Sequence, residues 1–182
     1  LLIIRTDMQS LKIRTFMSLA GQPLAENLQT GDEKQRKLGA QLLLSEVLEY
    51  VIHGLGVTPE VDGKPITAPD ALQYKISGES PDKIEMIDGL SDVAYTMYWN
   101  ALAFGIPLEE AFDLVCDNNL SKFVKLEGWG SGNGTIPRES WHLSRDISWP
   151  SEVVKVEVIN VNSEYYAVGK DQNGKVRKPS SY

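Results

Sequence analysis

The chain has 182 residues, of which 42% are hydrophobic, and this is enough for one globular domain that buries a sizeable core. Its formal net charge of -7 argues against a nucleic-acid polymer as partner, because proteins that bind the phosphate backbone usually carry a basic surface patch. A single cysteine, Cys116, excludes an intrachain disulfide and any zinc site built from several cysteines.

Helices are predicted first along the chain. Apolar residues at helical spacing predict a helix over about residues 7–20, which Gly21 ends. A second helix is predicted over about residues 32–52, opened by acidic residues and closed by "HGLG". The stretch 56–81 is rich in Gly and Pro, and we expect a long connection there.

Two more helices follow. Ser80 as N-cap and Pro81 in the first helical position predict a helix that continues to residue 104, and Pro107 opens the fourth helix. Four helices joined in series favour an antiparallel bundle. No apolar run is as long as a membrane span, and the N-terminal stretch lacks the features of a signal peptide. We therefore expect a soluble, cytoplasmic protein with no membrane partner.

The pattern changes after Phe123. The segment "EVVKVEVINVNSEYYAVGK" alternates apolar and polar residues around "NSE", which predicts a β-hairpin, and "QNGK" is a second turn candidate. We expect this part to be an appendage too small to form a core alone. The predicted fold class is mainly α: a four-helix bundle over residues 1–125 with a loop and a β-hairpin appendage over 126–182.

Carboxylates recur inside the two most apolar helices. In the second helix, Glu46 and Glu49 share one face with His53. In the third, Glu85, Asp88 and Asp92 again share a side. If the two rows face each other, several carboxylates converge in a partly buried cleft, which is tolerable only with a bound cation or with proton uptake.

Oxygen ligands of this kind favour Mg²⁺, with Mn²⁺ as an alternative. Such ions would be held by Glu46, Glu49, Asp88 and Asp92. A water bound to the metal can act as a nucleophile, and Glu49 is the candidate base that accepts its proton. A di-iron site is disfavoured, because it requires a Glu-x-x-His motif and His53 lies four residues after Glu49. The competing interpretation is that these acids form solvated helix faces.

Three segments in order resemble a known family: "FMSLAGQPLAENLQTGDEKQRKLGAQLLLSEVLEYV", "DGLSDVAYTMYWNALAFGIPLEEAFDLVCDNNLSK" and "DQNGKVRKPSSY". They are similar to the all-α nucleoside triphosphate pyrophosphohydrolases, the superfamily of MazG-like and phosphoribosyl-ATP pyrophosphohydrolase-like proteins that includes dimeric dUTPases. The resemblance covers about residues 10–125 and the last dozen, and it extends to phage and bacterial members.

What the resemblance implies is Mg²⁺-dependent cleavage of a nucleoside triphosphate to a monophosphate and pyrophosphate. The family's first carboxylate pair corresponds to Glu46 and Glu49. Its second motif, ExxD, places its Asp at Asp92, but the expected Glu is Gly89, so Asp88 or the earlier pair Glu85 and Asp88 takes its place. Many members begin the first motif with a double Glu, where this chain has Ser45.

Several polar residues are candidates for substrate binding. After the fourth helix, Asn119 and Lys122 resemble family residues that contact ribose or phosphate, although Asn119 can equally end the helix and Lys122 can be a surface lysine. Tyr95, three residues beyond Asp92, either bonds a ligand or packs. Lys175 and Lys178 resemble a basic tail that closes over phosphates, with a solvated turn as the alternative.

Trp129, Trp141 and Trp149 either stack on a base or cover the bundle, and covering is the commoner role for large aromatic side chains. His53 is expected to cap a helix end or to occupy a satisfied interior position. The second and third helices are apolar on most sides, which favours a homodimer or a dimer of dimers. The resemblance implies the same assembly, because members of the family generally form dimers. The alternative function is a nucleotide-sensing or protein-interaction bundle without turnover.

Overall fold

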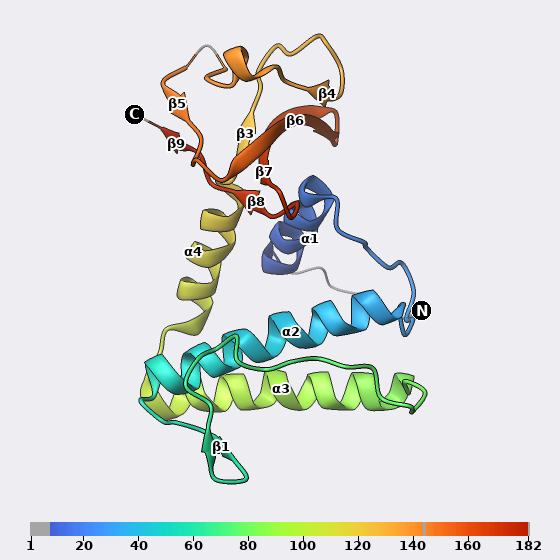
Figure 1. Ribbon diagram of the computed structural model, residues 1–182, viewed down its shortest axis with the longest axis vertical. Coiled ribbons are helices and arrows are strands. Elements are labelled where there is room, and N and C mark those ends of the chain that lie inside the picture. The colour runs from blue at the N-terminus through green and yellow to red at the C-terminus, as the bar shows by residue number, and fades with distance from the viewer. Residues whose placement is uncertain (1–7, 144, 182) are drawn as a thin grey trace. The chain divides into compact units, whose positions relative to one another are not determined.

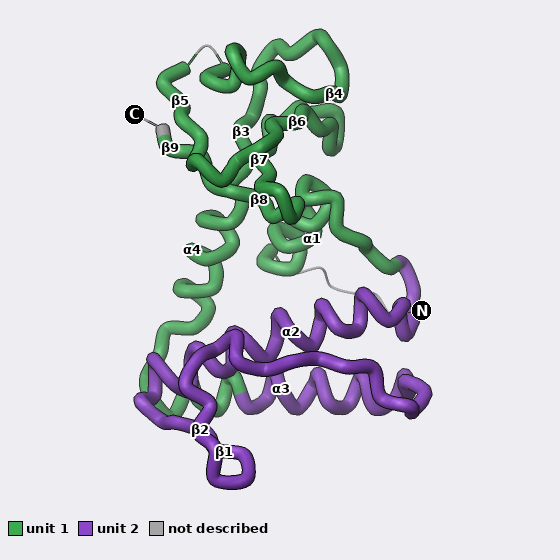
Figure 2. Tube along the Cα trace, viewed as in Figure 1, with its two compact units in different colours: residues 1–25, 97–182 green, residues 26–96 purple. Residues whose placement is uncertain are grey.

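The computed structural model describes residues 8–143 and 145–181 (Figure 1). The chain forms two compact units. Unit 1 takes the residues up to 25 and from 97 onward, and unit 2 takes residues 26–96 (Figure 2). The expected domains, residues 1–125 and 126–182, stay a prediction. Asp7, the first residue of the first predicted helix, lies outside the described residues.

The predicted fold class, a mainly α four-helix bundle, is wrong, because the chain is mixed α/β. Among the described residues there are four α-helices, but also a five-stranded antiparallel sheet and two two-stranded sheets. Two of the helices, α1 (Met8–Ala20) and α4 (Leu108–Leu120), belong to unit 1, and α1 packs against that unit's sheet. The strands that surround the predicted hairpin are only two or three residues long, which is too short to give a periodic signal.

Unit 2 contains α2 (Glu33–Glu49), a π-helical turn (Tyr50–Gly54) and most of α3 (Lys83–Phe104). The stretch predicted as a connection holds a small hairpin of β1 (Glu60–Val61) and β2 (Lys64–Pro65). Among the described residues of this unit only Leu48 is buried. Unit 2 therefore has almost no core of its own in a single chain.

Helix starts follow local capping. Asp32 caps α2 through a capping box, accepting a hydrogen bond from the Gln35 N–H while its own N–H donates to the Gln35 side chain. The predicted cap of α3 is wrong by two residues: the carboxylate of Asp82, not Ser80, accepts from the N–H groups of Ile84 (2.7 Å) and Glu85 (3.2 Å). Asp caps a helix as well as Ser does, and its negative charge also interacts favourably with the positive N-terminal end of the helix.

The large sheet of unit 1 is built on the predicted hairpin. Strands β6 (Val153–Val161) and β7 (Glu164–Asp171) pair through a two-residue turn, in which Asn162 and Ser163 both have positive φ, at 53° and 65°. The sheet order is β3-β7-β6-β4, and β8 also pairs with β7. The remaining elements are β3 (Phe123–Lys125), β4 (Gly134–Thr135), a 3₁₀ turn (Arg138–Ser140), β5 (Ile147–Ser148), β8 (Val176–Arg177) and β9 (Ser180–Ser181), with β9 paired to β5.

Both faces of this sheet are covered. On one face, Val156, Val158 and Ala167 form a buried cluster with Ile136 and Val153. On the other face, Val168 and Phe123 pack with Leu19 of α1. The first cluster comes wholly from the C-terminal third, so the expectation that this part is too small for a core is wrong.

Trp129, Trp141 and Trp149 pack against the first cluster. They therefore cover the sheet and not a helical bundle. Each indole N–H donates to a backbone carbonyl: Trp129 to Gly132 (2.8 Å), Trp141 to Ile136 (3.0 Å) and Trp149 to Trp141 (2.9 Å). No helix in the described part of the chain is both long enough and apolar enough to cross a bilayer.

Candidate functional site

The predicted carboxylates all lie in unit 2. Helix α2 carries Glu46 and Glu49, and α3 carries Glu85, Asp88 and Asp92. All five side chains are exposed. None of them makes an ion pair or a side-chain hydrogen bond to another described residue. Their charges are therefore available to a ligand.

The donor set suits Mg²⁺ or Mn²⁺, because these cations prefer carboxylate oxygens and keep water ligands. Within the described part of one chain, however, no group of three or more Asp, Glu, His or Cys side chains is close enough to hold a metal ion. A metal site on these helices thus needs ligands that single-chain geometry does not gather, such as substrate phosphates or a second copy.

A π-helical turn begins directly after Glu49. The chain widens at Tyr50–Gly54, where the Leu55 N–H donates to the Tyr50 carbonyl at 2.9 Å. Such turns are rare and occur often at functional sites, since they re-aim the side chains around them. His53 lies in this turn and is exposed, so the interior position is wrong, and helix-end capping by His53 stays a prediction. Nothing in the local sequence signalled the π-helical turn.

Tyr95, the other candidate on α3, is 71% exposed. It does not pack into a core within one chain. Its ring lies on the same helix as Asp88 and Asp92 and remains available to a ligand or to a second protein surface.

The predicted substrate-binding lysines come together in unit 1. Lys122 follows the end of α4, whereas Lys175 and Lys178 flank β8 more than 50 residues later. Strands β3 and β8 pair with consecutive stretches of β7, Tyr166–Val168 and Gly169–Lys170, and this brings the two segments together. The ammonium of Lys122 donates to Asn119 Oδ1 at 2.7 Å, and that of Lys178 donates to Asn118 Oδ1 at 2.8 Å.

The electrostatics of this lysine cluster (Lys122, Lys175 and Lys178) are unfavourable without an anion. Burial lowers the pKa of Lys122, and the charges of Lys175 and Lys178 lower it further. Among the described residues no carboxylate pairs with any of the three, although other unit 1 lysines such as Lys12 and Lys170 have acidic partners. Lys122 is partly buried, whereas Lys175 and Lys178 are exposed, and like charges grouped in this way favour a polyanion such as a phosphate chain.

Asn119 and Asn118 orient the cluster. Helix α4 ends one residue after Asn119, with Ser121 as C-cap, so the alternative in which Asn119 ends the helix is wrong. The Lys122 ammonium also lies 5.6 Å from the centre of the Phe16 ring. The sequence alone does not indicate a role for Asn118, because its partner Lys178 is 60 residues away in the chain.

Comparison with known proteins gives no match: no protein-family model, no curated protein and no solved structure matches the chain. The resemblance to the all-α nucleoside triphosphate pyrophosphohydrolases therefore stays a prediction.

Proposed function

We propose that the protein is a cytoplasmic, Mg²⁺-dependent nucleoside triphosphate pyrophosphohydrolase that converts a (d)NTP to its monophosphate and pyrophosphate. The observation that carries the proposal is the lysine cluster, because its three ammonium groups come from two distant segments and have no acidic partner in the described part of the chain. A triphosphate supplies the missing negative charge.

The carboxylates of α2 and α3 complete the chemistry. Glu46, Glu49, Asp88 and Asp92 would hold Mg²⁺ or Mn²⁺, with Glu85 as a further ligand in place of the family Glu missing at Gly89. The bound cation would neutralise phosphate oxygens and acidify a water ligand. Glu49 takes the water's proton.

A second copy of the chain is part of this proposal. Large apolar side chains on α2 and α3 stay exposed in one chain, among them Leu42 (56%), Ile87 (54%) and Leu90 (62%). Patches of this kind usually mark an interface, and symmetric homo-oligomers are the commonest assemblies. A homodimer would cover the apolar side chains and bring two sets of carboxylates together.

The test is pyrophosphate release from canonical and deoxynucleoside triphosphates with Mg²⁺. Glu49→Gln removes the base while keeping shape, and we expect it to abolish release. Glu60→Gln, an exposed carboxylate on β1, is the matched control and should keep the wild-type rate. Equal rates in both variants would contradict the role of Glu49.

The second candidate is a nucleotide sensor without turnover. It is favoured by one observation, that the described carboxylates do not gather into a metal site whereas the lysines do cluster. A sensor would be stabilised by a nucleoside triphosphate and would release no product.

A further inference from the structure

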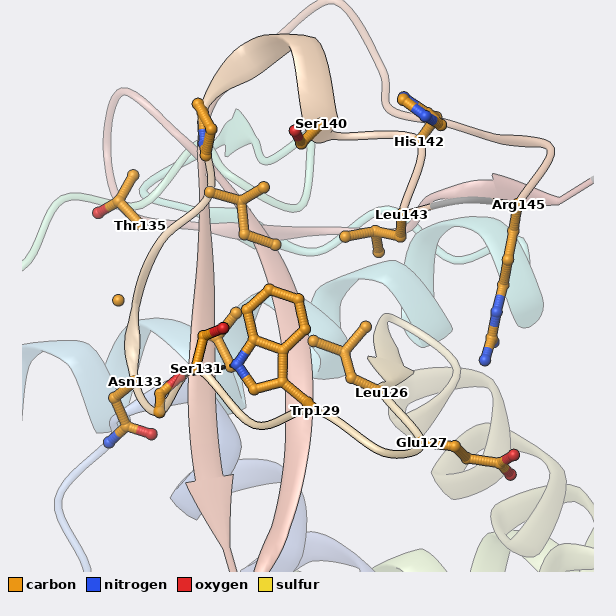
Figure 3. A pocket seen from close by; sticks show the side chains of 15 residues that line it. Leu126, Glu127, Trp129, Ser131, Asn133, Thr135, Ser140, His142, Leu143 and Arg145 are labelled. Atoms are coloured by element: carbon orange, nitrogen blue, oxygen red, sulfur yellow. Dashed lines mark hydrogen bonds between the residues drawn. The ribbon is translucent and has the colours of Figure 1, made fainter.

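A hollow of about 730 Å³ opens on the face of the unit 1 sheet that carries the cluster around Val158 and Ile136 (Figure 3). Its walls come from the glycine-rich loop that follows β3 and from the segment around the 3₁₀ turn. This volume is in the range that holds a small-molecule ligand. The function proposed above makes no use of it.

Apolar side chains line the middle of the hollow. Figure 3 shows the indole of Trp129 beside Leu126 and Leu143. The Trp129 N–H is already bonded to the Gly132 carbonyl, so the ring is fixed before any ligand arrives. A fixed aromatic ring in an apolar surround favours stacking by a planar ring.

The rim supplies both kinds of hydrogen-bonding group. Asn133 and Thr135 lie on one side of the hollow, and both are exposed. An amide offers a donor and an acceptor, and a hydroxyl can serve as either. These are the groups that the edge of a heterocyclic base requires.

A positive charge lies on the opposite side. Figure 3 shows Arg145 there, with His142 above it. Glu127 lies in the wall of the same hollow and Asp146 in the walls of neighbouring ones, but neither forms an ion pair with Arg145 in the described part of the chain. A neutral ligand such as a saccharide would leave the guanidinium without a counter-charge, whereas a phosphate would take two hydrogen bonds from it.

Arg145 also connects the hollow to the lysine cluster. It lines a second hollow of about 470 Å³, and Lys178 lies in the wall of that one. Arg145 and Lys178 share the wall of this second hollow with Asp146, so two cations link the Trp129 hollow with the predicted phosphate site within unit 1.

We propose that the Trp129 hollow binds the base of a nucleotide, stacked on the indole, with the phosphates directed over Arg145 toward Lys178. This deepens the proposed function and rests on it in one respect, the assignment of the lysine cluster to phosphates. It makes the C-terminal part of the chain, and not the helices, the source of base selectivity.

The test measures binding without divalent cations, so that no turnover intervenes. Equilibrium dialysis would compare AMP, GMP, CMP and UMP with ribose 5-phosphate on the wild type, on Arg145→Gln and on Arg14→Gln, an exposed arginine of α1 as matched control. Loss of a charge-assisted contact should weaken binding of the preferred nucleotide by about tenfold in Arg145→Gln. Arg14→Gln should bind like the wild type, and ribose 5-phosphate should bind at least about tenfold more weakly than the nucleotide.

A second readout reports stacking. The preferred nucleotide should quench the tryptophan emission of the wild type, and Trp129→Phe should lose that quenching while dialysis still detects the nucleotide. Unchanged affinity in Arg145→Gln, or equal affinity for ribose 5-phosphate, would overturn the proposal. The two proposals fail separately: pyrophosphate release with no effect of Arg145→Gln on binding defeats only the base site. Arg145-dependent binding without any product defeats only the hydrolase.

Discussion

Gly169 of β7 lies directly against the indole of Trp149, so closely that a Cβ at position 169 would overlap the six-membered ring. Gly169 is buried in the sheet. The indole therefore occupies the space that a side chain at position 169 would fill. Packing of Trp149 on the sheet requires glycine at this position.

Gly169→Ala should destabilise unit 1, because an extra methyl group in a packed site costs about 1–3 kcal/mol. Chemical denaturation followed by tryptophan emission measures the loss. Gly134→Ala is the matched control, since a Cβ there meets nothing within 4 Å, and its change should stay within about 0.5 kcal/mol. Equal stabilities of the two variants would show that Trp149 is not packed against Gly169.

Asp171 makes the stability of unit 1 depend on pH. Burial raises the pKa of its carboxyl, but hydrogen bonds from the N–H groups of Lys175 (3.0 Å) and Asn173 (2.9 Å), together with Arg177, outweigh burial and lower the pKa below the ordinary value of 3.8. Because the pKa is lower in the folded state, the ionised carboxyl stabilises the fold at any pH above its ordinary pKa. This stability is lost as the pH falls through the folded-state pKa.

Asp171→Asn should therefore lower Tm at pH 7, and its difference from the wild type should shrink as the pH falls from about 4 toward 2. Thermal melts across this window measure the difference. Asp146→Asn, an exposed carboxylate of the same unit, should match the wild type at every pH. A constant difference between wild type and Asp171→Asn would contradict the ionic role of Asp171.

Local signals explain which parts of the fold the sequence predicts. The start of α2 and the β6–β7 turn are set by neighbours within a few residues, namely the Asp32 capping box and the pair Asn162 and Ser163. The fold class was missed because β3, β4 and β8 are too short for a periodicity and pair over long distances in the chain. Their burial depends on tertiary contacts alone.

The candidate site, like the fold, is predicted from the sequence only in part. The resemblance predicts Lys122, Lys175 and Lys178 as substrate-binding residues, and the pairing of β3 and β8 with β7 brings their segments together. Helical spacing predicts that the carboxylates form one row on each helix. Whether the two rows converge depends on how helices and chains pack, and the periodicity of one sequence carries no information about that packing. Trp129 packs on the sheet and its indole also lines the hollow, and base stacking stays a proposal.

The lysine cluster should bind a phosphate chain without help from metal. Inorganic tripolyphosphate should raise Tm of the wild type, because it binds the folded state alone, and Lys122→Gln should lose most of that rise. Lys155→Gln is the control, since its charge is already neutralised by Glu157 at 2.6 Å. An equal rise in Lys122→Gln would remove the phosphate role of the cluster.

The exposed apolar side chains of α2 and α3 predict a change of oligomeric state. Leu90 is 62% exposed in one chain, so Leu90→Glu should cost a monomer little stability. In a homodimer the same change places a charge in the interface, and sedimentation velocity should show a shift from dimer to monomer. Gln41→Glu on α2 is a control for added charge, and a wild type that sediments as a monomer would contradict the dimer.

The most direct measurement of the central claim is phosphorus NMR of each nucleoside triphosphate incubated with the protein and Mg²⁺. Hydrolysis between the α and β phosphates predicts the signals of a nucleoside monophosphate and of pyrophosphate, appearing together with the wild type and absent with Glu49→Gln. A nucleoside diphosphate with orthophosphate, or an unchanged triphosphate for every base, would contradict the account.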